Sequence, residues 1–173
     1  MARIFIAIGF NHAFKQALVG VQNALKAKGV KGNYCAYGNL HLTLAFIGER
    51  YNLPEICKAV SEVAFRPFTL TLSTLGTFPT KAGVIWCGVE VCQAVTMLAH
   101  QLRQRLSAHD IQYSTLAFFP HISLVQHPKP IVTDVEVEKM SIMVDKIYVM
   151  KSERVAGELV YSEITRCSAL PLA

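Results

Sequence analysis

The chain has 173 residues, of which 52% are hydrophobic and 17% are charged, and its formal net charge is +5 at pH 7. This composition excludes a disordered chain, and the length suits one domain, residues 1–173, arranged in two lobes around a sizeable core. The apolar run at residues 4–10 is too short to cross a membrane and lacks a signal-peptide cleavage site, so we expect a cytoplasmic protein with no membrane partner. The modest positive charge favours an anionic ligand, but no dense run of Lys and Arg argues for duplex nucleic acid.

The first half of the chain predicts alternating strands and helices. Residues 3–10 are apolar and rich in Ile, as in a buried strand. Asn11 is a suitable N-cap for a helix whose apolar residues recur at helical spacing until Gly29 ends it. The other elements predicted in this half are a loop or short strand at 31–38, a strand through residue 47, a helix at 53–64 and a strand at 68–78.

The second half predicts a similar succession after a turn at 79–83. Residues 84–90 predict a strand, and residues 91–109 predict a helix with an apolar face. The remaining predictions are a short strand at 111–113, a strand within 116–125, a loop at Pro128 and Pro130, an alternating segment at 135–139, and strands at 142–150 and 159–165.

Two short motifs in different halves of the chain have the same pattern, His41-Leu42-Thr43-Leu44 and His121-Ile122-Ser123-Leu124. Successive side chains of a strand point to opposite faces, so each motif presents an imidazole and a hydroxyl on one face and aliphatic side chains on the other. A single motif of this kind is weak evidence of function. Two copies with matching aliphatic flanks favour a functional pair.

The shift along the chain that places His41 on His121 aligns more than the two motifs. It places the first strand on residues 83–90, and it places the helix that ends at Gly29 on the helix that ends near His109. Accidental self-similarity is the alternative, but the histidine motifs fall in register without a gap. We therefore expect an α+β fold with a pseudo-two-fold duplication, in which the two histidine strands face each other across a cleft.

Two facing imidazoles suit acid–base chemistry at a phosphodiester. A neutral ring can remove a proton from a nucleophile while a protonated ring gives one to the leaving oxygen. Thr43 and Ser123 lie beside the histidines and can donate hydrogen bonds to the phosphate oxygens. No carboxylate cluster accompanies the histidines, so we expect neither a metal site nor a cofactor.

The five cysteines are an odd number, are widely scattered and form no Cys-x-x-Cys pair. This pattern predicts reduced, mostly buried thiols rather than a disulfide framework or a zinc site. The five positions are Cys35, Cys57, Cys87, Cys92 and Cys167.

These motifs resemble those of the two-histidine (2H) phosphoesterase superfamily, and the flanking sequence is most similar to the RNA 2′,3′-cyclic phosphodiesterases, also called 2′-5′ RNA ligases. The resemblance covers nearly the whole chain. Besides the motifs it includes Arg3-Ile4-Phe5-Ile6-Ala7-Ile8 at the start, Val84-Ile85-Trp86-Cys87-Gly88-Val89 in the middle and the spaced residues Ser152, Gly157 and Tyr161 near the end.

The resemblance implies a bilobal fold with two antiparallel sheets flanking a central cleft and helices outside. It implies metal-independent opening of an RNA 2′,3′-cyclic phosphate to a 2′-phosphate, with weak reverse ligation. By motif position, His41 would be the general acid and His121 the general base, although the pseudo-symmetry lets either ring serve either role. Thr43 and Ser123 would hold the phosphate.

One departure from the family pattern concerns the residues after the second motif. The family often has a basic residue there, whereas this chain has Val125-Gln126. Lys81, Lys129 or Arg154 could supply the missing charge, although each is more often a solvated surface residue.

Aromatic residues beside the motifs are candidates for stacking on a terminal nucleobase. We single out Tyr34 and Phe119, and Phe10 with less weight; Trp86 is interpreted as a core residue.

Two other functions remain open at this point. One is a phosphodiesterase for small cyclic nucleotides, and the other is a non-catalytic nucleotide- or RNA-binding module that reuses the cleft. The expected partners are RNA ends or small cyclic nucleotides, and no protein partner is predicted.

Overall fold

The computed structural model describes residues 2–49, 51–78 and 83–172. Its helices are α1 (His12–Ala27), a short 3-10 helix η1 (Tyr37–Asn39), α2 (Leu53–Ser61) and α3 (Gln93–Ala108). Its strands are β1 (Arg3–Ile8), β2 (Lys31–Tyr34), β3 (Leu42–Gly48), β4 (Phe68–Thr77), β5 (Val84–Val89), β6 (His121–Lys129), β7 (Ser141–Val144), β8 (Lys146–Val155) and β9 (Glu158–Ser168). No helix in the described part of the chain is long and apolar enough to cross a membrane.

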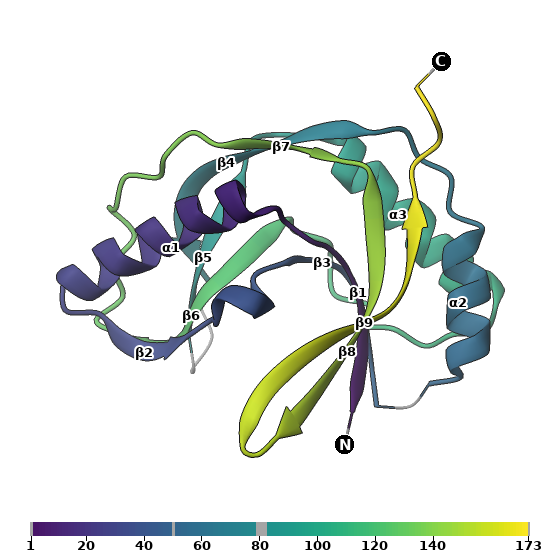
Figure 1. The fold of residues 1–173 in the computed structure, drawn as a ribbon, viewed down its shortest axis with the longest axis horizontal. Coiled ribbons are helices and arrows are strands. Elements are labelled where there is room, and N and C mark those ends of the chain that lie inside the picture. The colour runs from purple at the N-terminus through teal and green to yellow at the C-terminus, as the bar shows by residue number, and fades with distance from the viewer. Residues whose placement is uncertain (1, 50, 79–82, 173) are drawn as a thin grey trace.

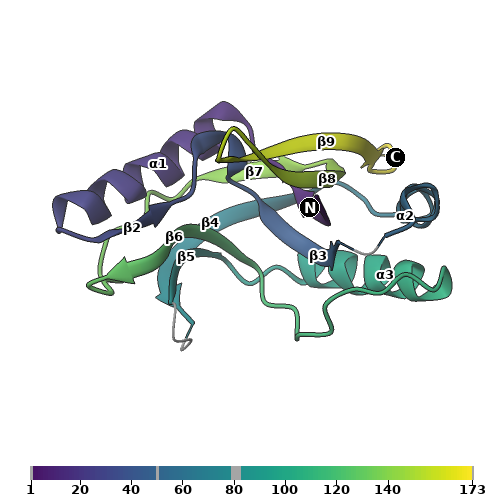
Figure 2. The same cartoon turned by 90° about the horizontal axis from the view of Figure 1, so that it is seen from below.

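The strands form two antiparallel sheets, as expected for the α+β class. One sheet has the order β3-β1-β8-β9, and the other has the order β2-β6-β5-β4-β7. Figure 1 shows α1 on one side of the molecule and α2 and α3 on the other. The view in Figure 2 separates the β8–β9 hairpin from strands β5 and β6.

The helices form where the sequence supplies an apolar face and suitable ends. In α1 the side chain of Asn11 accepts a hydrogen bond from the Phe14 backbone N–H at 2.9 Å, which caps the first turn. Gly29 adopts φ +80° just after the helix, a conformation that costs glycine little. In α3 the apolar face is also buried, and the turn that ends the helix places Asp110 at φ +54°.

Several predicted elements differ from the observed ones. The short strand predicted at 111–113 is not formed, because this segment pairs with no neighbouring strand, and the alternating segment at 135–139 is irregular. The predicted strand at 142–150 is divided at Asp145 into β7 and β8, since the chain there leaves one sheet and enters the other. The second histidine strand begins only at His121, but it continues through Pro128 to Lys129, because Lys31 of β2 pairs with Lys129. Most of the turn predicted at 79–83 lies outside the described residues.

The two repeats exchange strands. The shift that places His41 on His121 relates β1 to β5, β3 to β6 and β4 to β8 with only small offsets. Of these related strands, the first two in each repeat pair with each other, β1 with β3 and β5 with β6. The third strand crosses over, so β4 pairs with β5 and β8 pairs with β1. Each sheet therefore contains strands from both halves, and we propose that residues 1–173 fold as one bilobal domain.

Helices α1 and α3 also make hydrogen bonds to the half of the chain to which they do not belong. The buried Gln22 of α1 donates hydrogen bonds from Nε2 to the carbonyl oxygens of Leu124 at 3.0 Å and Cys35 at 2.9 Å. Arg103 of α3 donates from Nε to the carbonyl oxygen of Leu44 at 3.4 Å. Leu44 and Leu124 occupy matching positions in the two histidine motifs, so each helix is tied to the histidine strand of the other half.

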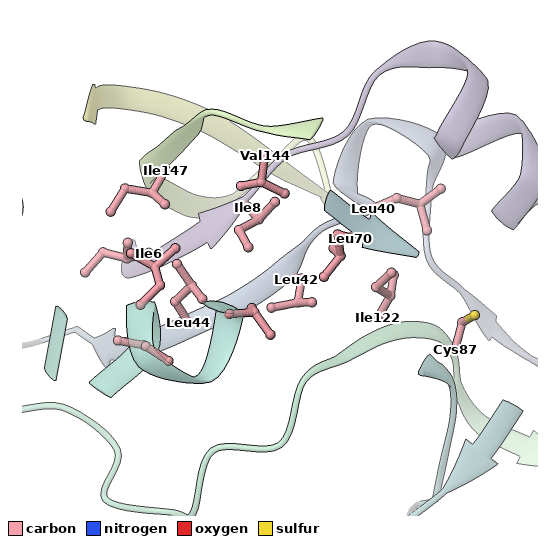
Figure 3. Packing of buried hydrophobic residues seen from close by; sticks show 14 of the residues in the cluster. Ile6, Ile8, Leu40, Leu42, Leu44, Leu70, Cys87, Ile122, Val144 and Ile147 are labelled. Atoms are coloured by element: carbon pink, nitrogen blue, oxygen red, sulfur yellow. The ribbon is translucent and has the colours of Figure 1, made fainter. Parts of the chain in front are cut away.

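The aliphatic side of both motifs lies in one hydrophobic core. Leu42, Leu44, Ile122 and Leu124 are fully buried, and they belong to a single cluster. Figure 3 shows Leu42 and Ile122 directed into this cluster. Because the aliphatic side chains are buried, the histidines and hydroxyls of the same strands are directed away from the core.

The five cysteines are all free thiols, as predicted, but only Cys87 is buried and the others are half-buried. Burial raises the pKa of Cys87 to about 12 and that of Cys35 to about 11, the latter against the lowering effect of the Lys15 charge.

We predict that Gln22→Leu destabilises the fold by about 1–3 kcal/mol, because the buried carbonyl oxygens of Leu124 and Cys35 lose a donor. Urea unfolding followed by circular dichroism would measure the difference. Asn23→Ala, on the exposed face of the same helix, is the matched control and should change stability by less than about 0.5 kcal/mol. Wild-type stability in the Gln22 variant would contradict the role given to this side chain.

Candidate active site

His41 lies immediately before β3 and is fixed by both ring nitrogens. Its Nδ1 is 2.7 Å from the carbonyl oxygen of Asn39, and its Nε2 is 2.9 Å from Oγ1 of Thr43. A carbonyl oxygen can only accept a hydrogen bond, so Nδ1 carries the hydrogen. In the neutral ring Nε2 then accepts a hydrogen bond from the Thr43 hydroxyl.

His121 is the first residue of β6 and is held in the same manner. Its Nδ1 is 2.7 Å from the carbonyl oxygen of Phe119, which is again the residue two positions earlier. The bond fixes the same tautomer, with Nε2 as the nitrogen left for chemistry. Ser123 follows two positions later, on the same face of the strand.

The two histidines come from different sheets, yet they are within electrostatic range of each other. Strands β3 and β6 are in contact. The pKa of His41 is lowered from its ordinary value, chiefly by burial; the hydrogen bond to Asn39 opposes this, and the charges of His121 and Lys15 lower it further. The sensitivity of His41 to the His121 charge is the electrostatic link between the two motifs.

Aromatic rings surround His41. The ring of Phe5 lies 4.8 Å from the imidazole, and that of Tyr161 lies 5.3 Å from it, edge to face. Phe5 and Tyr161 also contact each other at 5.0 Å. Burial raises the pKa of the Tyr161 hydroxyl. These rings remove water from around the His41 imidazole, which is the physical cause of its lowered pKa.

A second aromatic group surrounds His121. Phe78 lies 4.9 Å from the imidazole at an interplanar angle of 90°, Phe119 lies at 6.2 Å in a nearly parallel orientation, and Trp86 lies at 6.4 Å. Trp86 also contacts Phe119 at 5.0 Å and Phe78 at 5.5 Å. The interpretation of Trp86 as a core residue is wrong: its side chain is half-buried and belongs to this group, because in β5 it pairs with Ser123 of the histidine strand.

Gly76 makes room for the indole of Trp86. A Cβ at Gly76 would overlap with the carbon atoms of the indole ring. The absence of a side chain at this position of β4 therefore allows Trp86 to lie against the strand, in contact with the other two rings of the group.

A cavity of about 520 Å³ opens beside His41. Its walls are formed by β1, β7, β8 and β9, the residues around η1 and the start of α1. His41, Phe5, Tyr161 and Lys15 all line it. The volume falls in the range that holds small-molecule ligands.

The three aromatic residues considered for base stacking lie in different surroundings. Phe119 is 48% exposed beside His121, so its ring face is accessible. Phe10 lines the cavity and packs on Phe14 at 4.6 Å. Tyr34 is engaged elsewhere: its hydroxyl donates to the Val30 carbonyl at 2.7 Å, and its ring lies under the ammonium of Lys26.

The basic residues considered as substitutes for the missing charge do not lie at the histidines. Lys129 ends β6 opposite Lys31, and Arg154 donates to the carbonyl oxygen of Gly157 at the tip of the β8–β9 hairpin. Lys81 lies outside the described residues. Gln126 is an exposed residue of β6.

Sequence reasoning did not assign site roles to Phe5, Phe78, Tyr161 and Lys15. No signal for the first was present in the sequence: the shift that places His41 on His121 places Phe5 on Ile85, and only the observed starts of α1 and α3 relate Phe5 to Trp86. The other three come from elements whose crossing between the halves is not visible in the sequence. In the described part of the chain, no group of three or more His, Cys, Asp or Glu side chains is arranged to hold a metal ion.

The chain is similar to known proteins in sequence and in fold. Residues 24–156 match a family model described as the 2′-5′ RNA ligase superfamily. Proteins named RNA 2′,3′-cyclic phosphodiesterase are similar in sequence: one from Thermotoga maritima is 27% identical over 95% of this chain and 94% of its own length, and one from Escherichia coli is 36% identical over 59% of each chain. The crystal structure of E. coli LigT complexed with 3′-AMP superposes with a TM-score of 0.85, at 26% identity, over 98% of both chains.

We predict that Gly76→Ala displaces Trp86 and destabilises the protein by about 1–3 kcal/mol, the usual cost of overpacking. Trp86 is the single tryptophan of the chain, so a change in fluorescence emission reports its displacement. The control is Gly20→Ala on α1, where the added methyl group has no other atom within 4 Å. The free energy of unfolding of this variant should rise by about 0.5–1 kcal/mol, because Ala favours a helix more than Gly does. Unchanged fluorescence and stability in the Gly76 variant would show that the indole does not depend on this glycine.

Proposed function

Because the chain belongs to the 2′-5′ RNA ligase superfamily, we propose that it is an RNA 2′,3′-cyclic phosphodiesterase in which His41 and His121 divide the acid and base roles. The observation that supports this most directly is the matched fixation of the two rings. In both, Nδ1 donates to the carbonyl oxygen two positions earlier, which leaves Nε2 for proton transfer.

The proposed reaction opens the cyclic phosphate at its 3′ oxygen. His121 takes a proton from water, and the water oxygen forms a bond to phosphorus. The bond from phosphorus to the 3′ oxygen breaks, and His41 gives its proton to that oxygen. One water is consumed, and the product is a 2′-phosphomonoester with a free 3′ hydroxyl.

The hydroxyls of Thr43 and Ser123 would bind the phosphate oxygens that do not react. Each lies two positions after a histidine, on the same face of its strand. The Thr43 hydroxyl already donates to Nε2 of His41 when that ring is neutral. Its rotation towards a bound phosphate would release Nε2 for proton transfer, because a hydroxyl has only one hydrogen to donate.

His41 needs the substrate in order to act as an acid. Its lowered pKa favours the neutral ring in the free enzyme. A bound phosphodiester brings a negative charge beside the imidazole, which favours the protonated form and opposes the charges of His121 and Lys15. In this proposal the anionic substrate therefore supplies the charge that keeps the acid protonated.

Two further features belong to the proposal. The reaction needs no metal ion, because histidines and hydroxyls can provide both the proton transfers and the contacts to phosphate. Weak ligation follows from a change of nucleophile. A 5′ hydroxyl of RNA in place of water would give its proton to His121 and bond to phosphorus, while the bond to the 3′ oxygen breaks and His41 protonates that oxygen, which leaves a 2′-5′ linkage. Phe119 is the candidate for stacking on a nucleobase, since its ring is exposed beside His121.

A digest of a 2′,3′-cyclic phosphate in excess EDTA tests the function. We expect turnover to a 2′-phosphate, identified by phosphorus NMR, at the same rate with and without the chelator. His41→Ala and His121→Ala serve as controls, and each should lose about 10²–10⁴-fold in rate, the contribution of a positioned acid or base. A 3′-phosphate product, or a reaction that stops with EDTA, would contradict the mechanism.

The pH dependence provides a separate test of the histidine pair. We expect a bell-shaped profile of kcat/KM in which the alkaline limb marks the loss of the proton from the general acid His41. This limb is displaced to lower pH, because burial lowers the pKa of His41 in the free enzyme. The alkaline limb of kcat should lie at higher pH, since the bound phosphate raises the pKa of His41. A profile that is flat between about pH 5 and 8 is incompatible with histidine acid–base catalysis.

A further inference from the structure

Lys15 lies on the first turn of α1 and shares a cavity with His41. Its ammonium group is 4.9 Å from the centre of the Tyr37 ring, a cation–π distance. The Tyr37 hydroxyl is in turn 2.6 Å from Nδ1 of His12, one turn away on the same helix. The ammonium group is therefore held in place at the wall of the cavity.

Lys15 is the cation of this cavity that no carboxylate neutralises in the described part of the chain. The other charged groups of the cavity wall are paired. Glu163 accepts hydrogen bonds from Arg166 at 2.6 and 2.9 Å, and Asp145 lies 3.5 Å from Lys146. The cavity thus carries an unbalanced positive charge, which favours an anionic ligand.

The cavity extends from His41 away from the reacting phosphate. Of the four motif residues that would contact that phosphate, His41 lines the cavity, whereas Thr43, His121 and Ser123 do not. A ligand with its phosphate between the histidines would place its neighbouring part in the cavity, beside Phe5 and Tyr161. An anionic group at the other end of that part would meet Lys15.

We propose that this cavity holds the terminal nucleoside and that Lys15 binds the phosphate on its 5′ side. This inference rests on the proposed function and names its substrate class: RNA ends, in which a phosphodiester joins the last nucleotide to the chain, in preference to free nucleoside 2′,3′-cyclic phosphates. The cavity volume of about 520 Å³ and its aromatic wall suit a nucleoside. Burial is the main cause of the lowered His41 pKa, and the charge of Lys15 is the smallest of the causes that lower it.

Two substrates that differ by one phosphate test the inference: adenosine 2′,3′-cyclic phosphate and the same nucleotide with a 5′-phosphate. We expect the wild-type protein to favour the 5′-phosphorylated substrate by about tenfold or more in kcat/KM, the effect of one hydrogen bond to a charged group. The preference should come mainly from KM and should shrink as salt is added. A wild-type ratio near one would overturn the inference.

The variant Lys15→Gln assigns the preference to this side chain. We expect its ratio to fall close to one, because the 5′-phosphorylated substrate loses more in kcat/KM than the unphosphorylated substrate does. Lys15→Arg should keep most of the preference. Lys28→Gln, at the C-cap of the same helix, is the matched control, because Lys28 is paired with Asp134 at 3.1 Å and should leave the ratio unchanged. An equal loss on both substrates would mean that Lys15 serves the reacting phosphate, and it would overturn the proposal.

Calorimetry with product analogues separates this inference from the proposed activity. Wild-type protein should bind adenosine 2′,5′-bisphosphate about tenfold more tightly than adenosine 2′-phosphate, and equal affinities would overturn the inference even if a Lys15 variant fails to fold. No turnover of either cyclic substrate would instead sink the proposed function, while the two affinities would still decide the role of Lys15.

Discussion

The site depends on one hydrogen bond made twice, from Nδ1 of a histidine to the carbonyl oxygen two positions before it. Asn39 supplies the oxygen for His41 and Phe119 supplies it for His121, both at 2.7 Å. A carbonyl cannot donate, so the bond leaves one tautomer of the neutral ring, with Nε2 as the nitrogen available for proton transfer. The buried aliphatic residues between the functional ones hold each strand in this register. The backbone and the core therefore set the chemistry of the imidazoles before any ligand is present.

The two halves then make the two rings different. His41 is bonded to Thr43 and lies against Phe5 and Tyr161, and burial there lowers its pKa. His121 lies against three aromatic side chains, one of which is almost half exposed. Pairs of titratable groups in unlike surroundings are the usual basis of divided acid and base roles. A pseudo-symmetric scaffold thus carries an electrostatically asymmetric site.

Local pattern was sufficient to predict the histidine motifs, the helices and the duplication. The alternation His41-Leu42-Thr43 has a direct physical meaning on a strand, and it needs no knowledge of the rest of the fold. The strand exchange could not be predicted, because hydrophobic periodicity does not say which sheet a strand joins. For the same reason the break at Asp145 and the place of Trp86 beside His121 were missed. Lys15 is far from His41 in the sequence, and only the contact between α1 and η1 brings it to the same cavity.

The exchange of β4 and β8 has a consequence for how such a protein can change over time. Because β8 borders β1 in the sheet next to His41, the surroundings of the first histidine are partly encoded by the second half of the chain. The reverse holds for β4 and the second histidine. Replacing either repeat alone would therefore also remove a strand from the sheet beside the other repeat's histidine. The two repeats are therefore expected to evolve together as one unit, although each carries its own copy of the motif.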